Sequence, residues 1–145
     1  MLEALHRAGH EVRVWARASS DVSTLPHSKD VEVRRGSLLD EDALAAGMQG
    51  CDAVLHAAGG GKVLRIADVY RDNTETTAVL VAAALRAGVT RFVLVSSLAA
   101  GGGGPRPRVE SDVPRPASHY GKSKLEAEQR VLAARERMHV VIVRP

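Results

Sequence analysis

Tyr120 and Lys124 stand four residues apart at the start of a helical pattern, in the stretch His119-Tyr120-Gly121-Lys122-Ser123-Lys124. On a helix, side chains at this spacing share one face, with Cβ atoms about 6 Å apart. A neighbouring cation favours the phenolate form of a tyrosine, which otherwise titrates at about pH 10. Such a phenol can pass a proton to or from a substrate hydroxyl while a hydride moves on the carbon. Lys124 also has three donors that can reach ribose hydroxyls.

A hydroxyl partner for this pair stands upstream, at the end of a short apolar run. The run Arg91-Phe92-Val93-Leu94-Val95-Ser96-Ser97 is typical of a buried parallel strand. One of its two serines is expected to hydrogen-bond the substrate oxygen and hold it in line. Ser97 is preferred to Ser96, because alternation along a strand points only one of the two into the site.

These residues resemble a family signature. The stretch from Tyr120 to Lys124 resembles the YxxxK motif of short-chain dehydrogenases/reductases, and the strand ending at Ser97 precedes it at the usual spacing. Within that superfamily the chain resembles the extended branch, the NAD(P)-dependent epimerase/dehydratase and 3β-hydroxysteroid-dehydrogenase-like proteins. The resemblance covers essentially all 145 residues. It implies a catalytic triad of Ser97, Tyr120 and Lys124, with the catalytic hydroxyl second of the two serines. The alternative is an ordinary helix with a surface Tyr–Lys pair.

The family pattern also indicates where a dinucleotide would bind. Arg17 stands just past a predicted strand, where Rossmann domains read the adenosine ribose. A basic residue at this point, with no acid before Asp21, favours NADP over NAD as cofactor. NAD is kept as the second choice. The alternative for Arg17 is a solvated surface arginine.

Two further segments are expected to line the cofactor. Gly36-Ser37-Leu38-Leu39-Asp40 resembles the family's Gly-Asp-Leu-x-Asp adenine pocket, which assigns Ser37 and Leu38 to cofactor binding, although Ser37 replaces the acid. A plain strand-to-helix turn with Asp40 as N-cap is an equal interpretation. His56-Ala57-Ala58-Gly59 is similar to the family's H-x-A-A/G segment, whose small residues let a cofactor approach the backbone. Ala57, Ala58 and Gly59 are therefore assigned to cofactor binding, and His56 to packing within its strand.

Two other segments flank the proposed site. Asn73 matches an asparagine that supports the site in the family's long helix. The loop from Gly101 to Pro116 is rich in glycine, proline and arginine, which predicts either a lid or a mobile surface loop. Leu98-Ala99-Ala100-Gly101 replaces the aromatic–glycine pair of many extended members, which argues against a nucleotide-sugar epimerase.

The elements that must position these residues alternate between strand and helix, which predicts an α/β fold with a parallel sheet. Strands are expected at 10–15, 31–34, 53–58, 92–96 and 140–143, and helices at 2–8, 41–50, 66–87 and 119–138. The fold class is a partial Rossmann-type, doubly wound sheet whose first strand and glycine-rich turn are missing. We expect residues 1–145 to form a single truncated NAD(P)-binding domain, an internal fragment of a larger enzyme that is inactive on its own. Between the strands at Val12 and Val54, the sheet is expected to be interrupted.

Composition limits the remaining classes of function. The chain has 3% aromatic residues and a net charge of +3, which disfavours nucleic-acid binding. No apolar run approaches the roughly 18 residues of a membrane span, so no membrane partner is expected. A lone Cys51 fits a reducing cytoplasm. The histidines and the cysteine lack ligand spacing, so no metal site is expected. The expected partner is a small-molecule substrate, and a homodimer is left open.

The sequence therefore predicts an NAD(P)-dependent oxidoreductase that transfers a hydride between the nicotinamide and a carbonyl or secondary alcohol. One alternative is an NAD-dependent nucleotide-sugar epimerase or dehydratase, which uses the same triad for transient oxidation of a sugar. The other is a non-catalytic NADP-binding regulatory module. The Ser–Tyr–Lys set argues against this module, because binding alone does not need a phenol beside an ammonium.

Overall fold

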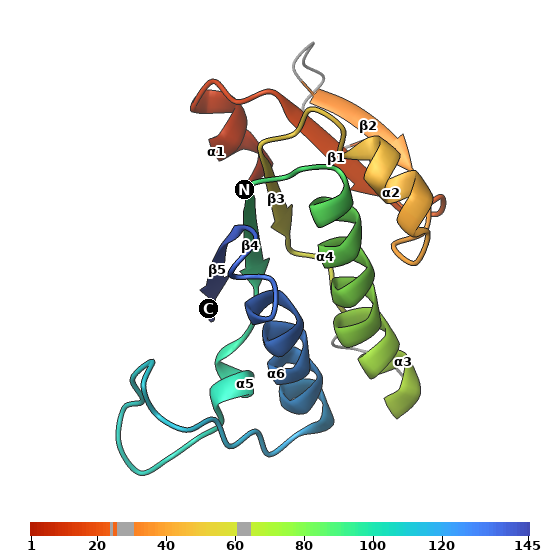
Figure 1. Ribbon diagram of the computed structural model, residues 1–145. Helices are drawn as coiled ribbons and strands as arrows, with labels where there is room; N and C mark the ends of the chain where they lie inside the picture. Colours follow the sequence, from red (N-terminus) through yellow and green to blue (C-terminus); the bar gives the residue numbers. More distant parts are fainter. Residues whose placement is uncertain (24, 26–30, 61–64) are drawn as a thin grey trace.

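The computed structural model describes residues 1–23, 25, 31–60 and 65–145, and shows strands alternating with helices (Figure 1). The five strands are β1 (Val12–Ala16), β2 (Val31–Arg35), β3 (Ala53–His56), β4 (Arg91–Val95) and β5 (His139–Val143). The helices are α1 (Leu2–Arg7), α2 (Glu41–Gly47), α3 (Ile66–Tyr70), the π-helical turn η1 (Arg71–Glu75), α4 (Thr76–Arg86), α5 (Leu98–Gly101) and α6 (His119–Leu132).

The strands form two separate parallel sheets. One holds β1 and β2, with Val12 opposite Val31, and the other holds β3, β4 and β5 in that order. Within the described residues no strand ladder joins β1 to β3. In Figure 1 the strands follow one another as β2, β1, β3, β4 and β5, which is the order of a Rossmann sheet without its first strand among the described residues. The predicted partial Rossmann fold, with its interruption between the strands at Val12 and Val54, is confirmed.

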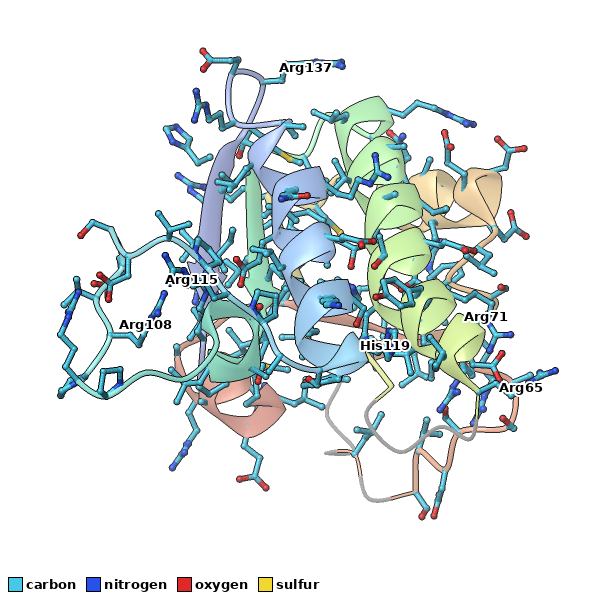
Figure 2. The ribbon with its side chains drawn as sticks, turned by 90° about the horizontal axis from the view of Figure 1, so that it is seen from below. Arg65, Arg71, Arg108, Arg115, His119 and Arg137 are labelled. Atoms are coloured by element: carbon cyan, nitrogen blue, oxygen red, sulfur yellow. The ribbon has the colours of Figure 1, made fainter. Side chains whose placement is uncertain are left out.

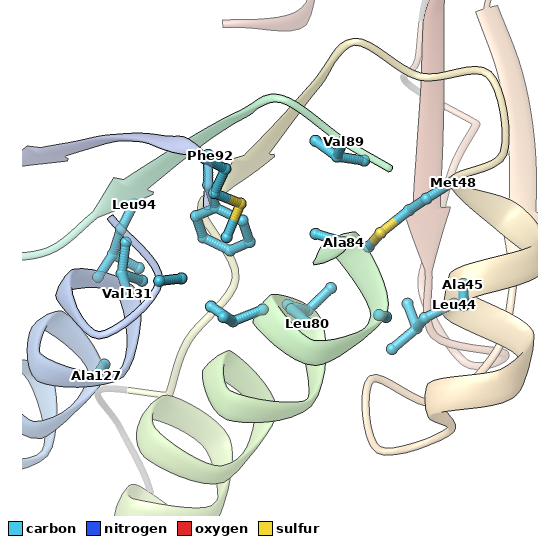
Figure 3. Packing of buried hydrophobic residues seen from close by; sticks show 14 residues of the cluster. Leu44, Ala45, Met48, Leu80, Ala84, Val89, Phe92, Leu94, Ala127 and Val131 are labelled. Atoms are coloured by element: carbon cyan, nitrogen blue, oxygen red, sulfur yellow. The ribbon is translucent and has the colours of Figure 1, made fainter. Parts of the chain in front are cut away.

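The core lies between the three-stranded sheet and the helices on one side of it. On β4 the side chains of Phe92 and Leu94 are fully buried, as the alternation of a strand requires. Figure 3 shows the buried cluster running from these residues past Leu80 of α4 to Leu44 of α2. Burial of each large apolar side chain contributes about 1.5–3 kcal/mol to the free energy of folding, so this cluster holds β4 against the helices. Away from these helices, Val141 of β5 is exposed.

The β1–β2 sheet is joined to α2 by Trp15 and Arg13. A Cβ on Gly36 or on Gly47 would lie 2.5 Å from the Trp15 ring, so the indole packs between two glycines and would have to move if either were replaced. The Arg13 guanidinium donates to the carbonyl oxygens of Gly47 and Gln49, at 2.5 and 3.0 Å. Side chains, rather than a shared ladder, therefore tie this sheet to the rest of the chain.

Several element bounds differ from the sequence prediction. The long helix expected at 66–87 is present as α3, η1 and α4, but with a π-helical turn inside it. The helix expected to reach residue 138 ends at Leu132, because the chain tightens into turns in which the amides of Ala134 and Arg135 bond three residues back. The strand expected at 53–58 ends at His56. No helix among the described residues is long and apolar enough to cross a membrane.

Candidate active site

Tyr120 lies in the first turn of α6, which packs against α5. The Ser118 hydroxyl caps α6 by accepting from the Gly121 amide at 3.0 Å. Gly121 is buried, and a Cβ at this position would overlap the carbonyl oxygen of Ala99. Ser97, in turn, is the N-cap of α5, and its hydroxyl accepts from the Ala99 amide at 3.2 Å. A close backbone contact thus joins the helix that Ser97 opens to the helix turn that carries Tyr120. The sequence had predicted only loop at α5.

Lys124 lies one turn further along α6 and is almost fully buried, with 4% of its surface exposed. Its ammonium donates to the carbonyl oxygen of Val95 at 2.7 Å, which places the charge at the carboxyl end of β4. Burial lowers the pKa of the Lys124 ammonium, and the carboxylate of Glu128 acts in the opposite direction. Tyr120 is half-buried. Within the described part of the chain its hydroxyl forms no hydrogen bond, so it is available to an incoming group.

The two serines at the end of β4 have different surroundings. Ser96 is 5% exposed, and its hydroxyl donates to Glu128 Oε1 at 2.5 Å. Arg144 clamps the same carboxylate through Nε and Nη2, at 2.8 and 2.5 Å. A buried carboxylate needs such partners to offset its desolvation. Ser96 therefore gives its hydroxyl hydrogen to a buried network, whereas the half-buried Ser97 hydroxyl only accepts, from the Ala99 amide, and within the described residues keeps its hydrogen to donate.

Asn73 holds three parts of the site together from within η1. Its side-chain amide donates to the Gly60 carbonyl and to the Ser123 hydroxyl, both at 3.0 Å, and its oxygen accepts from the Gly60 amide at 3.2 Å. A Cβ on Gly59 would lie 2.6 Å from Asn73 Oδ1 and 3.8 Å from Lys124 Nζ. The segment after β3, the π-helical turn and α6 therefore meet beside the Lys124 ammonium. A π-helical turn inside an α-helix is frequent at functional sites.

His56 is a buried strand histidine, as the sequence analysis inferred. Its ring is 4% exposed, lies 3.0 Å (Nε2) from Thr77 Oγ1 and makes an edge contact with Phe92. Burial first, and the positive charge of Lys124 second, lower the pKa of His56 to about 4. The imidazole is therefore neutral at physiological pH.

The residues assigned to cofactor binding next to Lys124 fit a dinucleotide. Ala57, Ala58 and Gly59 follow β3 directly and are exposed. Because β3 and β4 are parallel, their carboxyl ends share one edge of the sheet, the edge where Ser97 also stands. A floor of small residues beside a buried ammonium with further donor capacity suits a ribose that carries two hydroxyls. Gly59 is needed there, because a side chain would displace the Asn73 amide.

Arg17 follows β1 and is exposed, which agrees both with a cofactor contact and with the alternative of a solvated surface arginine. The loop that carries it is held by Arg35 at the end of β2. The Arg35 guanidinium donates to the carbonyl oxygens of Arg17, Ala18 and Ser20, at 3.2, 2.9 and 3.1 Å. Sequence reasoning did not identify Arg35. Its place opposite Ala16 follows from the β1–β2 register, which becomes visible only in the structure.

Ser37 and Leu38 follow β2 in a turn that leads into α2. Ser37 is exposed and its hydroxyl accepts from the Leu39 amide at 3.1 Å, while Leu38 packs against the core cluster. The Asp40 side chain caps α2 by accepting from the Ala43 amide at 3.0 Å, as the alternative interpretation of this segment predicted. Leu38 therefore has a packing role that does not depend on a cofactor.

The loop between α5 and α6 projects away from the helices in both views (Figures 1 and 2). It is organised around Asp112, which forms ion pairs with Arg106 at 2.7 Å and Arg108 at 3.6 Å. At the other side of the α6 start, His119 Nδ1 lies 3.3 Å from the Tyr70 hydroxyl of α3, and Figure 2 shows His119 beside the segment that carries Arg71. The loop is thus internally braced by charge, while α6 begins against α3.

Residues 1–145 match the model of a family described as NAD(P)H-binding. The chain belongs to this NAD(P)H-binding family. It is 33% identical over 151 residues to a 4-hydroxy-2-methyl-3-oxo-4-farnesyl-3,4-dihydroquinoline-1-oxide ketoreductase of Stigmatella aurantiaca, covering 100% of this chain and 45% of that protein. It is 39% identical over 100 residues to a 3β-hydroxysteroid dehydrogenase/Δ5→4-isomerase of Mycobacterium tuberculosis, covering 61% and 25%.

Among solved structures, UDP-glucose 4-epimerase of Brucella ovis in complex with NAD aligns with a TM-score of 0.88 and 26% identity, covering 98% of this chain and 46% of that one. The predicted membership of the extended short-chain dehydrogenase/reductase family is confirmed. The chain spans less than half the length of the ketoreductase and of the epimerase.

Within this NAD(P)H-binding domain, sequence reasoning missed the residues that support the site from behind. They are Thr77, Ser123, Glu128 and Arg144. Glu128 follows Lys124 by one helical turn, a spacing that places the two on one face and that was readable from the sequence. The ion pair of Glu128 with Arg144 spans 16 residues and depends on how α6 and β5 pack.

Proposed function

We propose that this chain carries the catalytic half of an NAD(P)-dependent oxidoreductase that reduces a small-molecule carbonyl or oxidises a secondary alcohol. One observation carries the proposal. The Lys124 ammonium is buried at the carboxyl end of β4, one helical turn from Tyr120, and the other serine at this strand end, Ser96, is occupied by Glu128. Ser97, which only accepts from the Ala99 amide, and Tyr120 each keep a hydroxyl hydrogen that no acceptor among the described residues takes, and both can meet a substrate oxygen.

In the proposed reaction the protein's own groups handle the proton. Tyr120 donates its hydroxyl proton to the carbonyl oxygen, or receives one from an alcohol in the reverse direction. The Lys124 ammonium, one turn away, stabilises the negative charge that the Tyr120 oxygen gains. Ser97 donates a hydrogen bond to the same substrate oxygen and holds it in line. A bound nicotinamide supplies or accepts the hydride.

An epimerase or dehydratase is the second candidate, because it uses the same three residues. What favours it is the fold similarity to UDP-glucose 4-epimerase of Brucella ovis over 98% of this chain. The match to a ketoreductase, which covers all of this chain and 45% of that protein, and Leu98-Ala99 in place of an aromatic–glycine pair favour the simple oxidoreductase instead. The two differ in cofactor use, since an epimerase regenerates its nicotinamide within each turnover.

For the cofactor we infer a preference for NADPH over NADH. Arg17 is exposed at the end of β1, and Arg35 adds a second guanidinium to the same loop. Two guanidinium groups at this point, of which that of Arg35 is held by the loop carbonyls, suit the 2′-phosphate that distinguishes NADP from NAD.

The function is tested by hydride transfer in the full natural protein that contains this chain, followed by the absorbance of NADPH with a panel of small aldehydes and ketones. Tyr120→Phe and Ser97→Ala are expected to lower kcat by about 10²–10⁴-fold while leaving the dissociation constant of NADPH within a few-fold. Ser96→Ala is the matched control. It removes a hydroxyl from the neighbouring position, and it should lower stability while keeping most of kcat. Unchanged turnover in Tyr120→Phe would refute the assignment of Tyr120 as the proton donor and acceptor.

A further inference from the structure

Behind the site, a continuous chain of hydrogen bonds runs from β3 to the π-helical turn. His56 Nε2 lies 3.0 Å from Thr77 Oγ1, and the Thr77 hydroxyl donates to the carbonyl oxygen of Asn73 at 2.5 Å. All three residues are buried, with exposed fractions of 4% or less. Neither His56 nor Thr77 has a part in the proposed proton transfer.

We propose that His56 and Thr77 are positioning residues, which act through Asn73 to set the cofactor floor at Gly59 and Gly60 against the Lys124 ammonium. The inference rests on the proposed function for the meaning of that floor. The inference goes beyond the proposed function because it gives two buried residues outside the triad a measurable role in cofactor binding.

The donor and acceptor in each of these hydrogen bonds follow from the number of hydrogens that each group has. A threonine hydroxyl has one hydrogen and can accept as well as donate. Because Thr77 gives its hydrogen to the Asn73 carbonyl, its oxygen must accept from His56. The neutral imidazole therefore carries its proton on Nε2 and leaves Nδ1 unprotonated. The groups around the ring agree with a neutral form, since Phe92 lies against its edge and the nearby charge of Lys124 is positive.

The hydrogen bonds of the Asn73 side chain show which parts of the site the His56–Thr77–Asn73 network positions. The Asn73 amide grips both backbone groups of Gly60 and the hydroxyl of Ser123, the residue next to Lys124. The Gly59 backbone lies so close to Asn73 that a Cβ there would overlap the amide oxygen. A shift of Asn73 would therefore move the floor and the ammonium relative to each other. A displacement of about 1 Å at such a site is enough to cost a large factor in rate.

The neighbouring Thr76 provides a matched control. Its hydroxyl donates to the Asp72 carbonyl at 2.7 Å, the same four-residue backbond that Thr77 makes, and it is buried to a similar degree. Among the described residues, Thr76 has no hydrogen bond to His56 or Asn73. Replacing either threonine with valine thus removes the same kind of hydrogen bond within the helix. Only Thr77→Val also breaks the hydrogen-bond network between His56 and Asn73.

The experiment compares Thr77→Val, Thr77→Ser and Thr76→Val in the full natural protein. Affinity for NADPH and NADH is measured by calorimetry, thermal stability by unfolding, and the protonation of the His56 ring by ¹⁵N NMR. We expect Thr77→Val to weaken cofactor binding by about tenfold, which equals one hydrogen bond of about 1.4 kcal/mol. Thr77→Ser should restore binding, and Thr76→Val should leave it unchanged at a similar melting temperature.

Two results would overturn the inference: equal cofactor affinity in Thr77→Val and Thr76→Val, or a His56 ring protonated on Nδ1. Binding and the ring signal are read without turnover. A wild-type protein that binds NADPH but transfers no hydride would therefore refute the oxidoreductase proposal, while the positioning role would still be judged by the affinities.

Discussion

His56 should make the folded protein unusually sensitive to mild acid. Its pKa is lowered to about 4 by burial and by the charge of Lys124, whereas a histidine in an unfolded chain titrates at about 6.5. The folded state therefore binds the proton more weakly, and the His56 contribution to stability is intact above about pH 6.5 and is lost as the pH falls toward 4. The loss amounts to about 2 kcal/mol at about pH 5 and about 3 kcal/mol at full protonation.

The assay is urea unfolding of the full natural protein at about pH 7.5 and about pH 5, compared with the variant His56→Gln. Glutamine keeps an N–H donor for the Thr77 hydroxyl but takes up no proton. The wild type should lose about 2 kcal/mol more than the variant between the two pH values. An equal loss in both proteins, or an imidazole that titrates by NMR near its ordinary pKa, would show that the ring is not sealed from water as the packing indicates.

Two more predictions concern charged groups. Arg144→Met should lower the free energy of unfolding by about 3 kcal/mol, because the buried Glu128 carboxylate loses both hydrogen bonds from Arg144 and keeps the one from Ser96, and adding Glu128→Gln should recover most of the loss in the same unfolding assay. A double variant no more stable than the single one would contradict this. Arg17→Ala should weaken NADPH binding by about tenfold and leave NADH binding unchanged in calorimetry. An equal loss of affinity for NADPH and NADH would show that Arg17 does not contact the 2′-phosphate.

Much of the fold and part of the site could be predicted because their signals are local. The four-residue spacing of Tyr120 and Lys124 follows from the period of a helix, and the alternation along β4 from the period of a strand. The helix α5 was missed because four small or apolar residues before a run of glycines resemble a loop. Its start depends on a cap by Ser97 and on contact with Gly121, which is distant in sequence.

The supporting network behind the site was not predictable for the same reason. The partners of Asn73 are 13 and 50 residues away, and the bond between Ser96 and Glu128 spans 32 residues. Such pairs exist only after the helices pack on the sheet. A preference for Ser97 could be argued from strand alternation, but only the buried Glu128 explains what the other hydroxyl does.

The indole clasped between Gly36 and Gly47 also makes the molecule its own optical probe. Trp15 is the single tryptophan of the chain, and its buried Nε1 has no hydrogen-bond partner among the described residues. The tryptophan fluorescence of this chain therefore arises from the β1–β2 sheet. Its emission wavelength reports whether water has entered between that sheet and α2. Loosening of this side of the molecule can thus be followed separately from events around Tyr120, with no label attached.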